Sequence, residues 1–354
     1  MTGQPELRAA RVLVDDSPEA IADYCYEQQW TDGLPVVPPT PERVRAMLAA
    51  LDRDAQEVVG QVPPYWADAT IEKIAINAVM AGCLPAYLPV VVAAVEALCD
   101  PAFNLYGIQA TTHPAAPLLI VNGPIASRLG LNSGANALGQ GARANATIGR
   151  AVRLVLINVG GGRPGLTDKS TQGQPGKYTY CLAENEAESP WEPLHVERGY
   201  SPSASAVTVV GAAAPQNVAD LFSQDASGLL AMLGHSSRSP GANNMLLGGE
   251  PLYALCPEHA AILSRDGYGK REVKQRLWEL ARVSFRDFSA ENQATLRAER
   301  AALYGSADAD TWVHLADRPE DVMLIVAGGP GGHSSLITTF GHTRAVTRPI
   351  TGAW

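Results

Sequence analysis

Three short apolar runs, each bounded by turn-forming residues, limit what this chain can fold into. They are Ala116–Val121 (APLLIV), Ala206–Ala212 (AVTVVGA) and Val322–Ala327 (VMLIVA). Each run predicts a buried strand. Apolar helix patterns, such as Ile71–Gly82 and Leu88–Cys99, precede the first of these strands. Buried strands that alternate with apolar helices predict an α/β fold with largely parallel sheets.

Composition excludes several classes of protein. The chain has 354 residues, of which 46% are hydrophobic and 18% are charged, a profile that fits neither disorder, collagen nor a coiled coil. A net charge of −9 gives no overall basic surface for nucleic acid or anionic membranes. The N-terminus lacks the pattern of a secretory signal, and the apolar run 88–99 is about half as long as a membrane span. We therefore expect a cytoplasmic protein.

Two helices are predicted near the N-terminus, over residues 18–29 and 41–52. Each begins with Ser or Thr followed by Pro and Glu, which supply an N-cap, a first-turn proline and a favourable charge at the positive helix end. The intervening segment, Trp30–Thr40 (WTDGLPVVPPT), contains a turn and three prolines that keep its backbone extended. Such a segment is expected to wrap over the body of the protein or to cover a site.

The two halves of the chain show a similar order of features. In the first half, Cys83 precedes a proline-started helix, and the strand 116–121 follows with a Gly-Pro turn at its end. In the second half, Cys256 precedes a proline-started helix, and the strand 322–327 follows with a glycine-rich turn that contains a proline. This order predicts an internal duplication.

The predicted duplication divides the chain into two related lobes with an active-site cleft between them. We expect an N-terminal α/β lobe with a helical extension over residues 1–165 and a C-terminal α/β lobe over residues 204–354. The connecting segment, 166–203, is loop-like, and so long an irregular stretch in a compact protein is either functional or a link between domains.

Two of the five cysteines are candidate catalytic thiols. Cys83 and Cys256 each precede a predicted helix, whose N-terminal N–H groups and dipole stabilise a thiolate. His259 lies about one helical turn after Cys256. The structural alternative is that both are buried core residues, because free cysteine behaves as a small apolar side chain. The cysteines are odd in number and scattered without a CxxC pair, so we expect free thiols.

A glycine- and asparagine-rich stretch before the predicted helix 142–158 is a candidate anion site. Backbone N–H groups at a helix start and nearby arginines favour a carboxylate or phosphate, although such a loop also serves only for close packing. The candidate substrate-binding residues are Asn122, Gly139, Gly141, Arg143, Asn145 and Arg150. The GxGxxG match that begins at Gly160 contains a proline and lacks the following helix, so we reject a dinucleotide site.

Two histidines are candidate proton donors. His333 follows the strand 322–327 on a glycine-rich turn, and His113 precedes the strand 116–121. Glu184 and Glu186, in an acidic loop beside Trp191, are candidate metal ligands or a candidate general acid, although acidic loops more often face solvent. No compact metal motif, nucleotide motif or haem motif is present, so the cofactor stays open and a metal would need distant residues.

Four segments resemble a bacterial family associated with UGSC-type thiol and selenocysteine proteins. They are Trp30–Val44, Ile76–Val90, Ala142–Val159 and Glu184–Gly199. The resemblance implies a reactive cysteine or selenocysteine within a U/C-Gly-Ser-Cys motif. The chain contains no CGSC, so that site does not transfer, and only Cys83 lies in a similar segment. The resemblance therefore implies a relative of these proteins or a partner subunit.

These patterns together predict an enzyme for a small anionic substrate. The leading hypothesis is thiol-dependent reduction or carbon–heteroatom bond cleavage, with Cys83 as nucleophile, Arg143 and Arg150 as anion-binding residues, and His333 or His113 as proton donor. One alternative is a metal-dependent lyase or hydrolase. Another is a non-catalytic accessory subunit of a heteromeric thiol enzyme. We expect a homo-oligomer without nucleic-acid or membrane partners.

Overall fold

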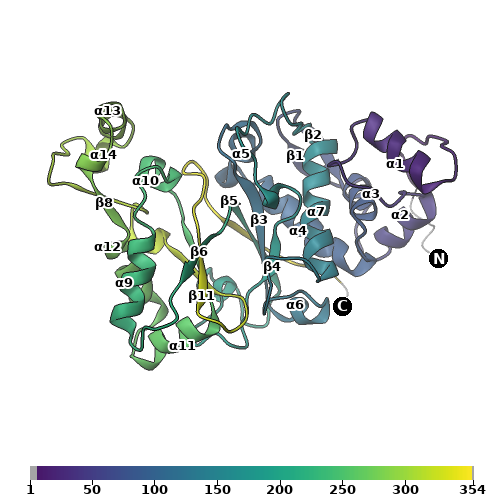
Figure 1. The fold of residues 1–354 in the computed structure, drawn as a ribbon. Coiled ribbons are helices and arrows are strands. Elements are labelled where there is room, and N and C mark those ends of the chain that lie inside the picture. Colours follow the sequence, from purple (N-terminus) through teal and green to yellow (C-terminus); the bar gives the residue numbers. More distant parts are fainter. Residues whose placement is uncertain (1–5, 353–354) are drawn as a thin grey trace.

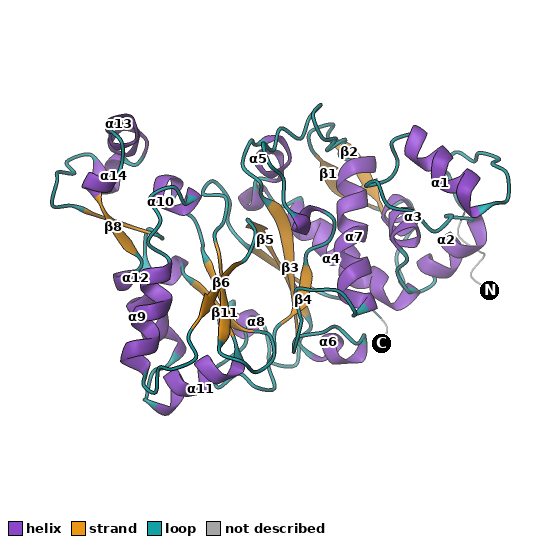
Figure 2. Cartoon of the chain, viewed as in Figure 1, coloured by secondary structure: helices purple, strands orange, loops and turns teal. Residues whose placement is uncertain are grey.

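The structure is a computed structural model that describes residues 6–352. Its helices and strands alternate along the chain (Figures 1 and 2). The helices are α1 (Pro18–Glu27), α2 (Pro41–Leu48), α3 (Ile71–Ala81), α4 (Leu88–Leu98), α5 (Leu105–Ala110), α6 (Pro124–Arg128), α7 (Arg143–Asn158), α8 (Leu194–Glu197), α9 (Ala226–Ser236), α10 (Asn243–Leu247), α11 (Pro257–Arg265), α12 (Lys270–Leu280), α13 (Ala290–Glu299) and α14 (Ala301–Tyr304). The strands are β1 (Val58–Val62), β2 (Ala67–Thr70), β3 (Ala116–Asn122), β4 (Cys181–Ala183), β5 (Ala206–Ala212), β6 (Gln216–Ala219), β7 (Leu252–Leu255), β8 (Arg282–Ser284), β9 (Trp312–His314), β10 (Met323–Val326), β11 (His333–Ile337) and β12 (Val346–Pro349).

The predicted helix starts and buried strands are present. Ser17 and Thr40 cap α1 and α2 through their side chains, and each helix has proline in its first turn. The predicted helix 142–158 is α7. The three apolar runs form β3, β5 and β10, and every residue of these strands is buried. The prediction of an α/β protein is therefore confirmed.

Two four-stranded sheets form the centre of the molecule, and both are mixed. The first has the order β12-β5-β3-β4, and the second has the order β10-β7-β11-β6. Only β3–β4 and β7–β10 are parallel, and the other four pairs are antiparallel. The prediction of largely parallel sheets is wrong because β5 runs antiparallel to β3 and β11 runs antiparallel to β7, and β12 and β6 each add a further antiparallel pair.

The two sheets pack face to face, with helices on their outer faces (Figure 2). Alternate residues of each strand point to opposite faces of its sheet and therefore pack in different hydrophobic cores. Leu118 and Ile120 of β3 meet Met323 and Ile325 of β10 in the core between the sheets. The residues between them on β3, including Leu119, face the helices α3, α4 and α7. Apolar side chains from both sheets form this central core, and two lobes with an active-site cleft between them stay a prediction.

Each half of the chain gives one strand to the sheet of the other half. β6 follows β5 directly but pairs with β11 in the second sheet, and β12 follows β11 but pairs with β5 in the first. The two crossing segments are hydrogen bonded to each other, from Ala213 N to Thr338 O and from Phe340 N to Gly211 O, both at 2.8 Å. We call this arrangement the strand exchange.

The strand exchange changes the predicted division of the chain. The predicted C-terminal lobe begins at residue 204, yet β5 and β12 belong to the first sheet, and the predicted connecting loop 166–203 contains β4 of that sheet. Both sheets have one parallel pair followed by two antiparallel pairs, which matches β3 with β7 and β4 with β10. The predicted duplication instead matches the strand 116–121 (β3) with the strand 322–327 (β10).

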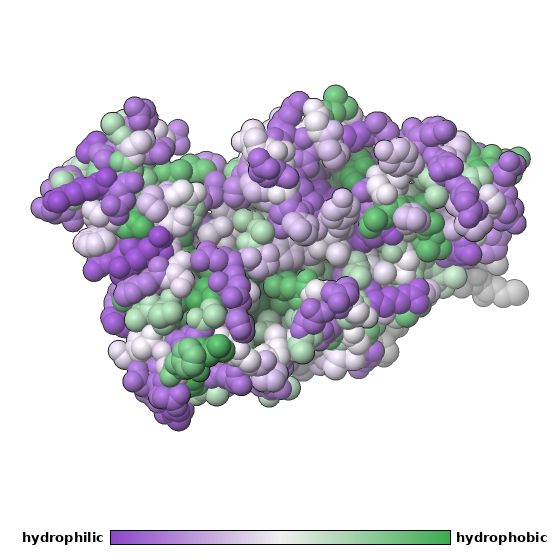
Figure 3. Space-filling model, in the orientation of Figure 1, coloured by the Kyte–Doolittle hydropathy of each residue, from purple (hydrophilic) through white to green (hydrophobic). Residues whose placement is uncertain are grey.

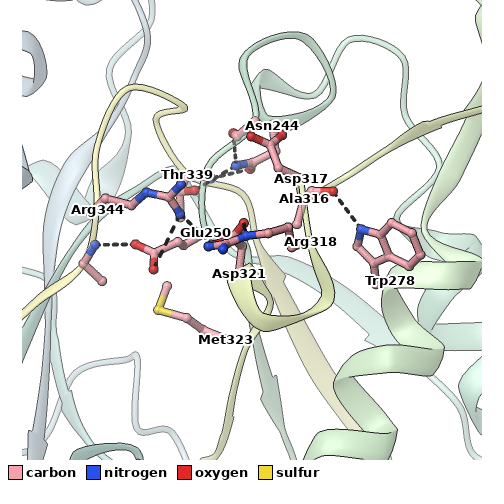
Figure 4. Close-up of polar contacts among 12 residues, drawn as sticks. Asn244, Glu250, Trp278, Ala316, Asp317, Arg318, Asp321, Met323, Thr339 and Arg344 are labelled. Atoms are coloured by element: carbon pink, nitrogen blue, oxygen red, sulfur yellow. Dashed lines mark hydrogen bonds and ion pairs between the residues drawn. The ribbon is translucent and has the colours of Figure 1, made fainter. Parts of the chain in front are cut away.

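A polar network holds the second crossing segment against the second sheet (Figure 4). The Arg344 guanidinium donates to Asp321 Oδ1 at 2.7 Å, and Ala345 N donates to Glu250 Oε2 at 2.5 Å. Asn244 Nδ2 donates to Thr339 Oγ1 at 2.8 Å in the same region. Burial raises the pKa of Glu250, although the Ala345 N–H and nearby arginines oppose this effect. The network serves to position the return of the chain to the first sheet.

Polar side chains cover most of the face shown in Figure 3, and apolar side chains there form separate patches. Within residues 6–352 no single helix is long and apolar enough to cross a bilayer. The bent pair Pro85–Leu98 and Pro101–Ala110, which meet at 72°, passes the same test of length and composition together. All five cysteines are free, as predicted.

Candidate functional site

A cavity of about 980 Å³ lies between α7 and two glycine-rich loops. One wall is the end of α1 with the turn that follows it, including Asp32 and Gly33. Other lining residues are 162–165 and several side chains between Asp168 and Tyr178, within the stretch that the sequence marks as irregular. The prediction that the segment after α1 covers a site is consistent with this wall.

Arg153 of α7 supplies the most informative charge in the cavity. Its side chain lines the cavity and is 8% exposed. Within residues 6–352 its guanidinium donates no hydrogen bond and forms no ion pair within 4 Å. Burial lowers the pKa of Arg153, and the charges of Asp168 and Asp32 oppose this effect from a greater distance. A buried guanidinium stays charged and offers five N–H donors in a planar fork. The arrangement therefore suits a carboxylate or a phosphate.

The two arginines predicted to bind an anion are occupied by the protein itself. Arg143 donates to Gly82 O through Nε and Nη2, at 3.2 and 2.9 Å. Arg150 forms a two-point pair with Asp32, at 2.8 Å for both contacts. The predicted helix and the predicted residue type are kept, but the residue differs. Of the α7 arginines, Arg153, three residues beyond Arg150, lines the cavity.

Lys177 and Asp168 form a buried ion pair at the cavity wall. The Lys177 Nζ atom lies 2.6 and 2.8 Å from the two carboxylate oxygens of Asp168, and Ser170 N donates to the same carboxylate at 3.0 Å. Burial lowers the pKa of Lys177, and Arg153 adds to this effect, whereas Asp168 opposes it. Arg153, Asp168 and Lys177 thus all line one cavity.

Hydrogen bonds join the N-terminal segment to α7 and to a glycine-rich loop of the cavity wall. Arg163 Nη1 donates to Gln29 Oε1 at 2.8 Å and so joins a glycine-rich loop to the turn after α1. Asn158 Nδ2 donates to Trp30 O at 2.9 Å. Together with the Arg150–Asp32 pair, these contacts fix the N-terminal segment over α7. The cavity is therefore built from segments that are more than a hundred residues apart in the sequence.

Cys83 is a core residue. Its thiol is 8% exposed, and Sγ lies 3.2 Å from Thr147 O, to which it donates. Burial raises the pKa of Cys83 to about 12. The 3-10 helix after it, Pro85–Tyr87, is a single turn, and α4 begins only at Leu88, so the helix dipole is too small to offset burial. The prediction that Cys83 is an activated nucleophile is not supported.

Cys83 is expected to resist alkylation in the native protein. At pH 8, iodoacetamide should label Cys83 at least about a thousandfold more slowly than an unfolded thiol, because the thiolate population is small and the sulfur is buried. Peptide mass spectrometry of protein labelled with and without urea measures this ratio. Equal labelling rates in the two conditions would return Cys83 to the list of candidate nucleophiles.

Cys256 has a more polar environment than Cys83. It directly precedes α11, and His259 on that helix lies between Ser334 Oγ, at 2.7 Å, and Asp220 O, at 2.9 Å. Burial raises the pKa of Cys256, but its interaction with His259 brings it below the ordinary value. The thiol is 1% exposed and does not line the cavity at Arg153. A catalytic role for Cys256 stays a prediction.

The two predicted proton donors lie in different parts of the molecule. His333 is exposed on β11 of the second sheet, where Nδ1 lies 3.0 Å from Asn217 Oδ1. His113 stacks on Phe340, with ring centroids 6.0 Å apart. Burial lowers the pKa of His113, and Lys177 adds to this effect. Neither histidine lines the cavity at Arg153.

Asn122, Glu184 and Glu186 come together at the carboxyl ends of β3 and β4. The amide of Asn122 donates to Glu184 Oε2 at 2.7 Å and to Glu186 Oε1 at 2.9 Å. His195 of α8 is fully buried beside them, with Nδ1 3.9 Å from Glu186 Oε1. Within the described chain, Asn122 Oδ1, Glu184 Oε1 and both His195 ring nitrogens are buried without a hydrogen-bond partner. We call these four residues the carboxylate cluster.

The carboxylate cluster holds one acid with a strongly shifted pKa. Burial raises the pKa of Glu184 to about 7, although Lys270 and hydrogen bonds from Leu194 N and Asn122 oppose the shift. In residues 6–352 no group of three His, Cys, Asp or Glu side chains has the arrangement of a metal site. The predicted metal ligands Glu184 and Glu186 are therefore best described as hydrogen-bond acceptors of Asn122.

The loop before α7 is a structural connection. Asn145 fixes it by accepting from Asn132 N at 2.8 Å and by donating to Asn132 O at 2.9 Å. The predicted anion contacts of Gly139 and Gly141, which are exposed in this loop, stay predictions.

A second cavity, of about 1060 Å³, lies under the N-terminal segment. Its lining is largely apolar, and its buried acid, Glu72, already accepts hydrogen bonds from Arg8 N, Ala9 N and Gln56. We therefore take the cavity at Arg153 as the candidate site.

Comparison with protein-family models, with curated proteins and with solved structures returned no match. Function is therefore inferred from the geometry of this chain.

Sequence reasoning missed Arg153, Asp168 and Lys177 as site residues. A signal was present, because Asp168 follows the glycine-rich stretch GGGRPG and Lys177 is the last residue of GQPGK, both in a long irregular segment. Their convergence with α7 depends on tertiary contacts that no local pattern contains.

Proposed function

We propose that this protein is an enzyme that binds a small carboxylate- or phosphate-bearing substrate in the cavity at Arg153. The buried, unpartnered guanidinium of Arg153 is the observation that carries the proposal. Asp168 and Asp32 offset part of the cost of burying this charge, but neither is hydrogen bonded to it, and an anion in direct contact stabilises it further. A small anion that enters the cavity supplies that partner.

The Lys177–Asp168 pair gives this site a means of proton transfer. A lysine whose pKa is lowered and a carboxylate in contact with it act as a general acid and base for a substrate held nearby. This chemistry suits the cleavage of a carbon–heteroatom bond, in which a proton leaves carbon and another reaches the leaving group. The thiol-dependent route has weaker support, because Cys83 is buried away from the cavity.

Anion binding tests the proposal. Isothermal titration of the native protein with phosphate, malonate and pyruvate is expected to show binding of at least one of these anions. Arg153→Gln should weaken that binding about tenfold to a hundredfold, because a charged hydrogen-bond donor is lost.

The matched control is Arg271→Gln, which removes the same charge from the exposed surface of α12. It should bind as the native protein does. Binding that is absent for all three anions, or that Arg153→Gln leaves unchanged, contradicts the proposed function.

A further inference from the structure

Lys177 combines three properties that a lysine needs for covalent catalysis. It lines the cavity, its side chain is 16% exposed, and its Nζ atom lies 2.6 Å from a carboxylate oxygen of Asp168 that can accept its proton. A second cationic group, Arg153, lines the same cavity. Burial and a neighbouring positive charge both increase the fraction of neutral, nucleophilic amine.

Stability alone gives a poor account of this pair. A buried ion pair usually contributes little net stability, because desolvation offsets its attraction. Two glycine-rich loops bring the pair to the wall of a large cavity, where a ligand can reach it. The arrangement therefore suits a reaction of the amine with a ligand.

We propose that Lys177 forms an imine with a 2-oxo acid whose carboxylate is bound by Arg153. A 2-oxo acid places an electrophilic carbonyl directly beside a carboxylate, which matches a cavity that offers one amine and one free guanidinium. This inference rests on the proposed function and names its substrate class. The cavity volume of about 980 Å³ is ample for a small acid with substituents beyond its carbonyl group.

The imine step balances with groups that the site holds. The Lys177 ammonium gives a proton to Asp168, and the neutral Nζ atom forms a bond to the carbonyl carbon. Asp168 returns the proton to the carbonyl oxygen, and the resulting carbinolamine loses its hydroxyl group as water after that group takes up a proton from Nζ through Asp168. Loss of water leaves one proton on the nitrogen, so the product is the protonated imine and Asp168 is again a carboxylate. The overall change is one ammonium and one ketone to one protonated imine and one water.

The protonated imine makes the hydrogens on the adjacent carbon more acidic. Transfer of one of these protons to the Asp168 carboxylate places an electron pair where it can expel a leaving group one bond further along the substrate, and Asp168 then gives the proton to the departing heteroatom. This sequence provides the carbon–heteroatom cleavage of the proposed function without a resident cofactor.

Borohydride trapping tests the proposal. The native protein is incubated with pyruvate, oxaloacetate or 2-oxoglutarate and then reduced, and peptides are mapped by mass spectrometry. We expect a reduced adduct of at least one of these acids at Lys177 and not at the exposed Lys169. Arg153→Gln should lower the yield at a fixed acid concentration about tenfold or more, because binding weakens.

Lys177→Arg is the second variant, because arginine keeps a cation beside Asp168 and cannot form this imine. Its thermal melting should resemble that of the native protein, and adduct formation should be lost. Anion binding measured by titration separates the two proposals. If an acid binds in an Arg153-dependent way but no adduct forms at Lys177, the imine proposal is wrong and the proposed function stands. If the phosphate, malonate and 2-oxo acid probes all fail to bind, both proposals are wrong.

Discussion

Ionisation of Glu184 is expected to lower the unfolding free energy of the native protein by about 2–3 kcal/mol between pH 5 and pH 8. Replacing Glu184 with glutamine should abolish this loss. Burial raises the pKa of Glu184 from 4.5 to about 7, so the folded state holds this proton more tightly than the unfolded state. The stabilising contribution is full below pH 4.5 and is lost as the pH rises through 7. At pH 8 the folded protein must hold an ionised carboxylate, one oxygen of which lacks a partner in the described chain.

Urea denaturation of both proteins at pH 5 and pH 8 measures this effect. Glu184→Gln keeps an oxygen that accepts from Asn122 and Leu194 N, and it should be more stable than the native protein at pH 8 by a margin that shrinks at pH 5. Other groups also titrate in this range, so the difference between the two proteins is the informative quantity. Glu188→Gln, at an exposed position in the same loop, is the control. A difference that does not change with pH contradicts burial as the cause.

Replacing Gly123 with alanine is expected to cost at least about 3 kcal/mol of unfolding free energy. Gly123 ends β3 with φ of 83° and ψ of −173°, a conformation that only glycine adopts readily. A Cβ atom added there would lie 2.1 Å from Ala204 O, which is backbone and has little freedom to move. The Gly123 N–H also donates to Glu186 Oε1 at 2.7 Å, so the substitution should disturb the carboxylate cluster.

Gly130→Ala is the matched control for this substitution. Gly130 also has a positive φ, of 68°, but no atom lies within 4 Å of a Cβ added there. It isolates the backbone cost, which we expect to be about 1–2 kcal/mol. Urea denaturation of both variants compares the two effects. Equal losses in the two variants would mean that the contact with Ala204 is unimportant.

The local structure was more predictable than the sheet arrangement. Ser17 and Thr40 marked helix starts because capping is decided within one turn of chain. The apolar run of β3 marked a buried strand for a similar reason. Strand direction was not predictable in the same way, because β6 (QNVA) and β12 (VTRP) are short and carry few apolar residues. The direction of β5 against β3 and of β11 against β7 is likewise set by how the connecting segments pack, which a local pattern does not contain.

The candidate site was predictable in kind but not in detail. The arginines of α7 indicated an anion site. Which of them lacks an ion pair depends on Asp32, which lies far away in the sequence and pairs with Arg150. The lowered pKa predicted for Cys83 is not supported, because burial raises the pKa of its thiol. That burial and the hydrogen bond to Thr147 O both depend on packing against α7. Lys177 and Asp168 share no motif, since an ion pair between two loops requires only that folding brings them together.

The strand exchange has a consequence for how this chain can be divided. A fragment that ends after β5 keeps three strands of the first sheet and exposes the edge of β5 that β12 covers. A fragment that begins at β7 exposes the edge of β11 that β6 covers. Each half therefore acts as the other's edge protection against strand-to-strand aggregation. A piece of this protein that keeps both sheets whole and both of these edges covered spans β3 to β12, so neither half is an independent module for evolution or for engineering.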